Sequence, residues 1–177
     1  MSANKIVITG GPGTGKTSII KNLKEHGHIC LPEISRQVTL EARKNGIEQL
    51  FLENPMLFSE KLLEGRKRQF FEALQHEKRI VFLDRGLPDV LAYMSYIGDP
   101  LPQHFEEACK QHKYDKVFLL PPWEAIYQPD TERYESFEQA VAIHDYLEKT
   151  YEGFGYTLIN VPFDEVHKRA EFILNNI

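Results

Sequence analysis

The sequence predicts an α/β domain built on a five-stranded parallel sheet, and two observations support this fold class. Short runs rich in β-branched and aromatic residues alternate with longer amphipathic segments, as in strand–helix–strand crossover units. A chain of 177 residues, of which 42% are hydrophobic, is also long enough to bury one substantial core. We therefore expect a single domain over residues 1–177.

The strands are expected where the β-rich runs are short. The first run reads KIVIT, the second HICLP and the third RIVFL. The five predicted strands cover residues 5–9, 28–32, 79–83, 115–120 and 156–161. Proline-bearing stretches at 98–102 and 120–123 are expected to be loops, because ordered elements resume on both sides of them.

The segments between the strands predict helices. Their ranges are 15–25, 34–45, 56–77, 87–97, 102–112, 133–152 and 163–175. In the long central helix Leu63, Phe70 and Leu74 share one face, whereas the run 66–68, Arg-Lys-Arg, is expected to face solvent. The clearest periodicity is a stripe that we expect to face the core. Its members are Phe137, Val141, His144, Leu147 and Tyr151. His144 is expected in the core or at its edge and not as a ligand.

The segment directly after the first strand predicts a triphosphate-binding loop. Residues 10–17 read GGPGTGKT, which matches G-x-x-x-x-G-K-[ST], and a helix is expected to follow at once. Glycines let several backbone N–H groups converge on phosphate, and the helix N-terminus adds its dipole. Lys16 can reach the β- and γ-phosphates, and the Thr17 hydroxyl can bind Mg²⁺. The residues expected to bind the nucleotide are Gly11, Gly13, Thr14, Gly15, Lys16, Thr17 and Ser18.

Two further candidates end the third strand. Asp84 follows four apolar residues, and an acid at such a position can lie beside the phosphate loop and hold Mg²⁺ directly or through water. Arg85 offers a fork of donors suited to a phosphate or to an acceptor. The structural alternatives are a helix cap for Asp84 and a surface ion pair for Arg85. Asp89 is expected either to be an acid at the start of the next helix or to contact substrate.

The second strand brings Glu33 to the same carboxyl edge of the sheet, and Arg36 follows one turn later. Ligands of open parallel sheets bind at that edge. Glu33 could orient or deprotonate an acceptor hydroxyl, while Arg36 could bind an anionic group of the acceptor. The alternative is that Glu33 only starts the next helix and that Arg36 lies in solvent.

A polar stretch between the fourth strand and the clearest helix predicts a lid near residues 123–136. A cation that arrives when such a lid closes stabilises the moving phosphoryl group and excludes water, and Arg133 fits this role. An intrahelical pair with nearby glutamates is the alternative. The segment 160–163, NVPF, offers either an apolar edge for a nucleotide base or core packing.

Bulk properties exclude several other classes. The net charge of −5 and a pI near 5.8 argue against nucleic acid or an anionic membrane as the main partner. No apolar stretch has the length of a membrane span. The pattern of the first strand begins by Lys5, which leaves no room for a secretion signal before it, so a cytoplasmic protein is expected. Cys30 and Cys109 are expected to be buried apolar residues, and the histidines lack metal-ligand spacing. The oligomeric state stays open.

The chain resembles small P-loop kinases over nearly its whole length. The segments that carry the resemblance are GGPGTGKT, PEISRQV, FLDRGLPDVLAY, LPPWEAIYQPDTERYESFEQAV and GYTLINVP. They are similar to the group that contains the nicotinamide riboside kinase domain of NadR-type proteins and related "AAA domain" NTPases. The resemblance implies a three-layer α/β/α fold of the nucleoside-kinase type, strand order 2-3-1-4-5, ATP and Mg²⁺ at the P-loop, and an arginine-bearing lid.

The same resemblance implies roles for single residues. Lys16 and Thr17 would contact phosphate and metal, and Asp84 would hold Mg²⁺. Glu33 would activate the acceptor, and Arg85 would bind acceptor or phosphate. Arg133 would act from the lid. Deoxynucleoside kinases usually show Glu-Arg-Ser where residues 84–86 of this chain are Asp-Arg-Gly, which leaves the acceptor open.

The leading hypothesis is an ATP- and Mg²⁺-dependent phosphotransferase that acts on a nucleoside, a nucleotide or a related ribosyl compound. Its predicted catalytic residues are Lys16, Glu33, Asp84, Arg85 and Arg133, and whether Glu33 or Asp84 is the base stays open. The alternative is a regulatory NTPase that hydrolyses ATP or GTP slowly and signals through a partner. No Asn-Lys-x-Asp element follows the fourth strand, which argues against an ordinary GTPase. A polynucleotide end kinase is a third possibility that the acidic balance disfavours.

Overall fold

A parallel sheet of five strands in the order β2-β3-β1-β4-β5 lies at the centre of the molecule. The computed structural model describes residues 3–128 and 135–177. The strands are β1 (Asn4–Gly10), β2 (Ile29–Leu31), β3 (Ile80–Asp84), β4 (Lys116–Leu120) and β5 (Leu158–Asn160). All five predicted strands are present, and the three-layer fold with strand order 2-3-1-4-5 is confirmed.

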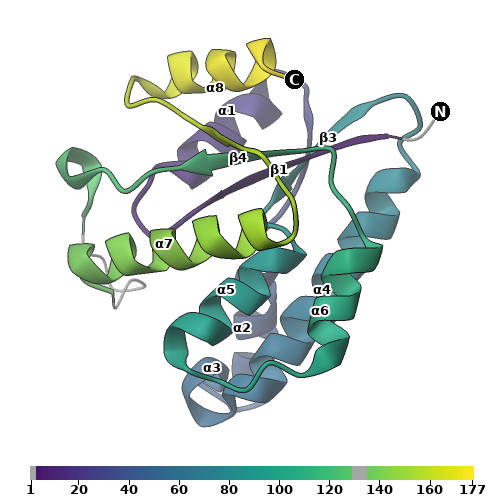
Figure 1. The fold of residues 1–177 in the computed structure, drawn as a ribbon, viewed down its shortest axis with the longest axis vertical. Helices are drawn as coiled ribbons and strands as arrows, with labels where there is room; N and C mark the ends of the chain where they lie inside the picture. Colours follow the sequence, from purple (N-terminus) through teal and green to yellow (C-terminus); the bar gives the residue numbers. More distant parts are fainter. Residues whose placement is uncertain (1–2, 129–134) are drawn as a thin grey trace.

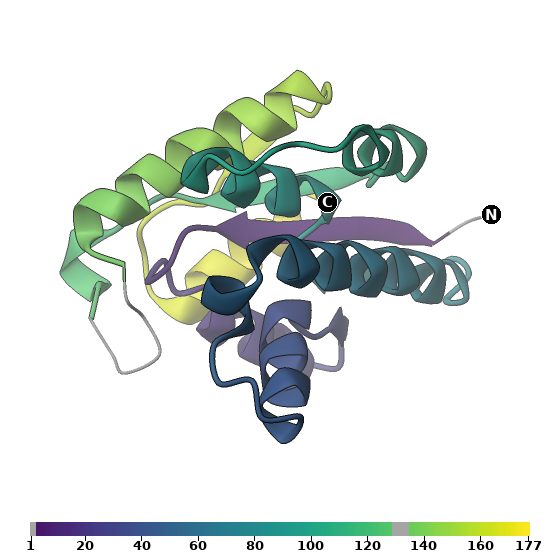
Figure 2. The ribbon, with the colours of Figure 1, turned by 90° about the horizontal axis from the view of Figure 1, so that it is seen from below.

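Helices cover both faces of this sheet. One face carries α1 (Lys16–Glu25) and α8 (Val166–Asn175), and the other carries α4 (Pro55–Leu74), α5 (Leu87–Ile97), α6 (Gln103–Gln111) and α7 (Phe137–Gly153) (Figure 1). Seen from below, α7 in light green and α4 in dark blue run roughly along β1 (Figure 2). The remaining elements are α2 (Ile34–Lys44), the short α3 (Leu50–Glu53) and the 3₁₀ turn η1 (Glu124–Ile126).

Alternation along the strands divides the core into two layers. In β1, Val7 packs with the cluster under α4, α5 and α7, while Ile6 and Ile8 pack with the cluster under α1 and α8. A strand that is buried on both faces reads as a continuous apolar run, as KIVIT does. The register pairs Ile8 with Asp84, so β1 and β3 end side by side and deliver their polar residues to one edge.

The predicted solvated run in α4 is wrong at its first residue. Arg66 is 3% exposed, and its Nη1 donates a hydrogen bond to the carbonyl oxygen of Gly86 at 3.1 Å. Lys67 is half-buried and Arg68 is exposed, as expected. Arg66 Nη1 meets a main-chain acceptor and the charge is balanced by Asp89, although Nε is buried without a hydrogen-bond partner, and no spacing rule within one helix reveals such contacts.

The predicted core stripe of α7 is also partly wrong. Leu147 and Tyr151 are fully buried and His144 is half-buried at the core edge, as expected, but Val141 is 39% exposed. The residues that face the core are Ala140, Ile143, Leu147 and Tyr151. The helix begins at Phe137, because the preceding Ser136 accepts from the Gln139 amide in a capping box. The stripe is therefore offset by one residue at its N-terminal end, where small Ala140 lies nearest the loop after β1.

The two cysteines are free and buried, as expected. Burial raises the pKa of the Cys30 thiol to about 11 and that of the Cys109 thiol to about 12, so both are neutral at physiological pH. Within the described residues no helix is both long and apolar enough to cross a membrane.

Candidate active site

The loop between β1 and α1 has the backbone of a phosphate cradle. Gly13 and Gly15 have φ angles of +72° and +84°, which residues with a Cβ rarely adopt. Thr14 is buried, and its hydroxyl donates to the Gly11 carbonyl oxygen at 3.0 Å, which fixes the turn. Gly15 is the N-cap residue of α1, and Thr17 and Ser18 in the first turn are exposed. The first amides of α1 are therefore presented with the positive end of the helix dipole.

Lys16 and Asp84 form a buried ion pair at the carboxyl edge of the sheet. The Lys16 ammonium donates to Asp84 Oδ1, and the two side chains are only 7% and 9% exposed. The structure thus places Asp84 beside the loop, where the sequence suggested a Mg²⁺ ligand, and not as a helix cap. A phosphate in the loop would compete with Asp84 for this ammonium, since both are anions within its reach.

Glu33 and Arg85 form a second ion pair at the same edge. Arg85 Nε donates to Glu33 Oε1 at 2.9 Å, and Ser35 Oγ donates to the same oxygen at 2.7 Å. Arg85 Nη1 donates to the Gly10 carbonyl oxygen at 3.0 Å, at the start of the phosphate loop. Arg85 therefore connects the carboxylate that follows β2 to the loop that follows β1, and it does not lie in a surface ion pair.

The electrostatic surroundings keep Glu33 ionised. Burial by itself would raise the pKa of Glu33, but the positive charges of Arg85 and Lys16 and the hydrogen bond from Ser35 outweigh it and hold the pKa far below the usual 4.5. Glu33 occupies the N-cap position of α2, yet its side chain makes no capping hydrogen bond there. Its carboxylate faces the Arg85 guanidinium, which favours a role at the site over a role in starting the helix.

Two further residues were predicted at the site, Arg36 and Arg133. Arg36 lies in the first turn of α2 and is exposed. Arg133 lies outside the described residues, so its predicted role in the lid stays a prediction.

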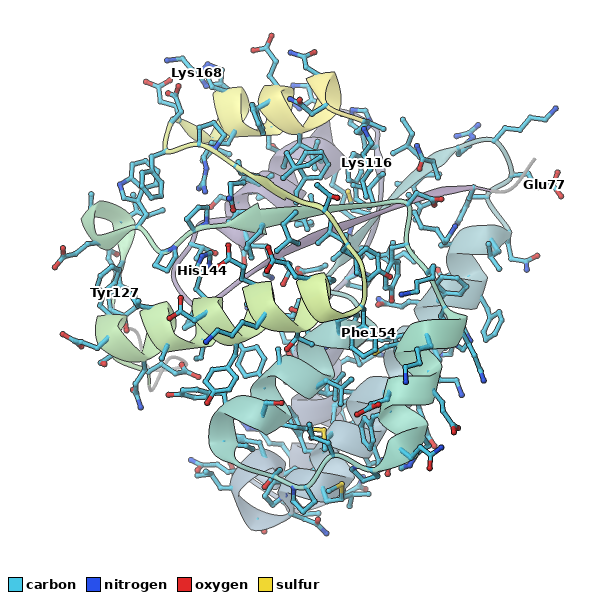
Figure 3. The ribbon with its side chains drawn as sticks, in the orientation of Figure 1. Glu77, Lys116, Tyr127, His144, Phe154 and Lys168 are labelled. Carbon is cyan, nitrogen blue, oxygen red and sulfur yellow. The ribbon has the colours of Figure 1, made fainter. Side chains whose placement is uncertain are left out.

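The described part of the predicted lid contacts the phosphate loop directly. A Cβ on Gly13 would lie 2.5 Å from Tyr127 Cδ2, so the Tyr127 ring packs on this glycine. The Tyr127 hydroxyl donates to the Glu135 carbonyl oxygen, and its ring contacts Phe137 edge-on. Tyr127 lies beside the N-terminal end of α7 (Figure 3). The two ends of the lid segment are therefore held together next to the loop.

An aromatic and cationic cluster lies beside the loop. Its segment 160–163 was predicted to offer an edge for a nucleotide base or core packing, but its arginine, Arg169, was missed. Trp123 stacks on Phe163, with ring centroids 5.0 Å apart, and the Arg169 guanidinium carbon lies 5.5 Å from the Trp123 ring. Arg169 is 2% exposed and donates to the Thr14 carbonyl oxygen at 2.9 Å and to the Pro162 carbonyl oxygen at 3.0 Å. Its Nη2 is buried without a hydrogen-bond partner. The sequence held one signal of its burial, because Arg169 lies on the same helix face as apolar Ile173.

The donor set around the loop fits a hard cation bound together with phosphate. The Asp84 carboxylate and the Thr17 hydroxyl are oxygen ligands of the kind that Mg²⁺ prefers, and Mg²⁺ commonly takes its remaining ligands from phosphates and water. No group of three His, Cys, Asp or Glu side chains gathers into a metal-binding cluster in the parts of the chain that the structure describes. The oxygen ligands beside the loop therefore suit Mg²⁺ that is bound together with a nucleotide.

The strand order and the glycine loop together define a P-loop protein with a nucleoside-kinase type of fold. A family model described as "AAA domain" matches residues 5–169, and the chain belongs to this family. No curated protein matches the sequence.

Solved structures with this fold include kinases of small molecules. Deoxyadenosine kinase from M. mycoides with bound products is 18% identical, with 97% of both chains covered and a TM-score of 0.68. NadR in complex with NAD and AMP-PNP is 16% identical with a TM-score of 0.74, and 98% of this chain matches 49% of NadR. Thymidylate kinase from Ehrlichia chaffeensis is 14% identical, with 99% of both chains covered and a TM-score of 0.65. The fold that the sequence resemblance implied is confirmed.

Proposed function

We propose that this protein is an ATP- and Mg²⁺-dependent phosphotransferase whose acceptor is a nucleoside, a nucleotide or a related ribosyl compound. The observation that carries the proposal is the Glu33–Arg85 pair, which Arg85 ties to the phosphate loop at Gly10. Hydrolysis requires only a positioned water, whereas an ionised carboxylate with an arginine beside it suits a hydroxyl acceptor. Structures with this fold include deoxyadenosine kinase with bound dATP and NadR with AMP-PNP, which supports the reaction class.

The phosphate loop and Lys16 would bind the donor. Amides at the start of α1 would hold the phosphates, and Lys16 would turn from Asp84 toward the β- and γ-phosphates as they arrive. Thr17 and Asp84 would hold Mg²⁺, which neutralises the charge that develops on the phosphates. Because Asp84 loses its lysine partner in this exchange, its carboxylate would become available to the metal as the nucleotide binds.

Glu33 would align the acceptor hydroxyl rather than remove its proton early. Its lowered pKa makes it a weak base, since the charges of Arg85 and Lys16 stabilise the carboxylate form. A weak base suffices where the transition state is loose and the acceptor oxygen is little changed, so positioning supplies most of the rate. Asp84 is the poorer candidate for the base, because its carboxylate would be engaged with Mg²⁺ once the nucleotide is bound.

The Trp123 cluster would hold the base of the donor nucleotide. Trp123 and Phe163 form an aromatic surface near the loop, and Arg169 joins this surface to the Thr14 carbonyl. A purine could stack on such a surface, and the unpartnered Nη2 of Arg169 is a donor for an acceptor atom of the ligand. Phe163 is 53% exposed, so the edge of this surface is accessible, and the segment at 160–163 serves core packing through buried Val161 as well.

A coupled assay of ADP release tests the proposal against the regulatory NTPase. Wild-type protein is incubated with Mg²⁺-ATP and a panel of nucleosides, nucleotides and ribosyl pyridines, with a control without acceptor. We expect at least one acceptor to raise ADP release well above the control and to gain one phosphoryl group by mass spectrometry. Equal release with and without every acceptor would contradict the kinase and favour slow hydrolysis.

A further inference from the structure

Arg85 is held in a backbone conformation that an arginine rarely adopts. Its φ angle is +74°, in the left-handed region that residues with a Cβ rarely adopt. Its guanidinium nevertheless has partners at Nε, at Nη1 and over one face. It donates to Glu33, to the Gly10 carbonyl and to Asp89 Oδ1 at 3.2 Å, and its Cζ lies 5.3 Å from the Tyr93 ring. The surrounding structure must therefore determine where this side chain points.

Among the contacts of Arg85, Asp89 is the residue best placed to fix the direction of its side chain. Asp89 is 0% exposed, and four donors from three parts of the fold converge on its carboxylate. Thr9 Oγ1 from β1 and Arg85 Nη1 donate to Oδ1, at 2.5 and 3.2 Å. The Gly86 amide and the Tyr151 hydroxyl from α7 donate to Oδ2, at 2.8 and 2.5 Å. The carboxylate is thus fixed from β1, from the end of β3 and from α7 at once.

We propose that Asp89 is a positioning residue for phosphoryl transfer, acting through Arg85 on Glu33. This inference rests on the proposed kinase function, because it assigns Asp89 a part in orienting the Glu33 carboxylate, which would align the acceptor hydroxyl. Asp89 Oδ1 anchors one end of the Arg85 guanidinium, and the Nε at the other end holds Glu33. Without that anchor Nη1 keeps only the neutral Gly10 carbonyl as its acceptor, so the guanidinium is held less firmly and Glu33 is oriented less firmly through it.

A capping role alone does not account for this arrangement. The capping box at the start of α5 needs only an oxygen that accepts from the Gly86 amide, and Oδ2 supplies it. Oδ1 makes no capping hydrogen bond and instead faces Thr9 and Arg85. Charged and titratable groups around Asp89 include Arg85, Arg66 from α4 and Tyr151 from α7, and the neutral Tyr93 and Cys109 also lie within its electrostatic reach. An ionised carboxylate between two arginines can orient a guanidinium in a way that a neutral cap cannot.

The kinetic test compares two variants that each alter this carboxylate. Asp89→Asn replaces it by an amide of the same size, and Tyr151→Phe removes a hydrogen bond from Oδ2 only. With the acceptor found for the wild-type protein, we expect Asp89→Asn to lower kcat/KM for the acceptor about 10- to 100-fold and to leave the Kd for Mg²⁺-ATP within about threefold. Tyr151→Phe should change kcat/KM less than threefold, although it removes a buried hydrogen bond. In an Arg85→Lys background, Asp89→Asn should cost less than a further threefold.

A second readout needs no turnover. The Arg85 Nε–Hε signal in a ¹⁵N spectrum, assigned by its loss in Arg85→Lys, reports the hydrogen bond to Glu33. We expect Asp89→Asn to shift this signal or broaden it through exchange with water, and Tyr151→Phe to leave it in place. If Asp89→Asn does not fold, Asp89→Ser keeps an oxygen for the Gly86 amide and loses the anchor for Arg85, and the same shift is expected.

The outcomes separate this inference from the proposed function. An unmoved Arg85 signal in a folded Asp89 variant overturns the positioning role, whatever the activity. The positioning role also fails if Asp89→Asn and Tyr151→Phe lower kcat/KM by the same factor and if these decreases parallel the two variants' losses of thermal stability. If no acceptor is phosphorylated by the wild-type protein, the kinase proposal fails, and the spectrum alone then decides whether Asp89 fixes Arg85.

Discussion

Replacing Glu33 by glutamine separates its charge from its shape. The glutamine keeps a carbonyl oxygen that can accept from Arg85 Nε and Ser35 Oγ, which lie at 2.9 and 2.7 Å from Glu33 Oε1. What is lost is the negative charge that would align the acceptor hydroxyl. Loss of a general base or aligning carboxylate typically lowers kcat by about 10²- to 10⁴-fold, which corresponds to about 3–5 kcal/mol of transition-state stabilisation.

The same substitution should weaken the fold only modestly. The Glu33 side chain is 22% exposed, and its loss leaves the Arg85 guanidinium paired with Asp89 alone. We expect a cost of about 1–3 kcal/mol at neutral pH, the usual range for one buried charged group that loses a partner. Because the folded pKa of Glu33 lies below its ordinary value of 4.5, its stabilisation is present above that pH and is lost as the pH falls through the folded pKa. The stability difference between variant and wild type should therefore shrink in acid.

The assay measures ADP release at saturating Mg²⁺-ATP while the acceptor concentration is varied, with Mg²⁺-ATP affinity and thermal unfolding measured on the same samples. Since Glu33 is already ionised, the wild-type rate should show no acid limb from this residue between about pH 5 and 8. Turnover of the glutamine variant within threefold of wild type would refute the assignment. Loss of ATP affinity in parallel with the rate would also refute it, because Glu33 would then belong to the donor site or to the fold.

Three further substitutions test the lid, the loop and the base site. Arg133→Ala should lower kcat at least tenfold with little change in Mg²⁺-ATP affinity, and an effect on affinity alone in calorimetry would argue against a lid cation. Gly13→Ala should destabilise the protein by about 1–3 kcal/mol in thermal unfolding, because its φ is +72° and its Cβ would lie 2.5 Å from the Tyr127 ring. The steric part of that cost should disappear in a Tyr127→Ala background, and an unchanged cost there would contradict the contact. Trp123 is the chain's single tryptophan, so its fluorescence should change when Mg²⁺-ATP binds. Trp123→Ala should weaken that binding about 3- to 30-fold by calorimetry while a phenylalanine largely retains it, and unchanged affinity in the alanine variant would exclude base stacking there.

Local patterns were enough to predict the framework of this fold. The glycine loop is recognisable because it needs particular residues at particular spacings, and the β-rich runs fix the strands without knowledge of their neighbours. Asp84 and Glu33 could be placed together because parallel strands end at a common edge. The short α3 at Leu50–Glu53 was not predicted, since four residues carry no periodicity.

The features that local sequence patterns could not predict depend on hydrogen-bond partners from distant elements. Arg66 and Arg169 are charged residues in amphipathic helices, and each is buried because it meets a main-chain carbonyl that lies far away in sequence. The convergence of four donors on Asp89 likewise depends on β1 and α7, which no helix-capping rule includes. Tertiary hydrogen bonding thus overrides the expectation that charge faces solvent.

Calorimetric titration of Mg²⁺-ATP into wild-type protein and Lys16→Ala tests the central claim most directly, namely that the loop at residues 10–17 binds a nucleoside triphosphate. We expect saturable binding by the wild-type protein and a loss of at least tenfold in affinity for a folded Lys16→Ala variant. Absence of binding by the wild-type protein at millimolar nucleotide, or equal affinity in both proteins, would contradict the account.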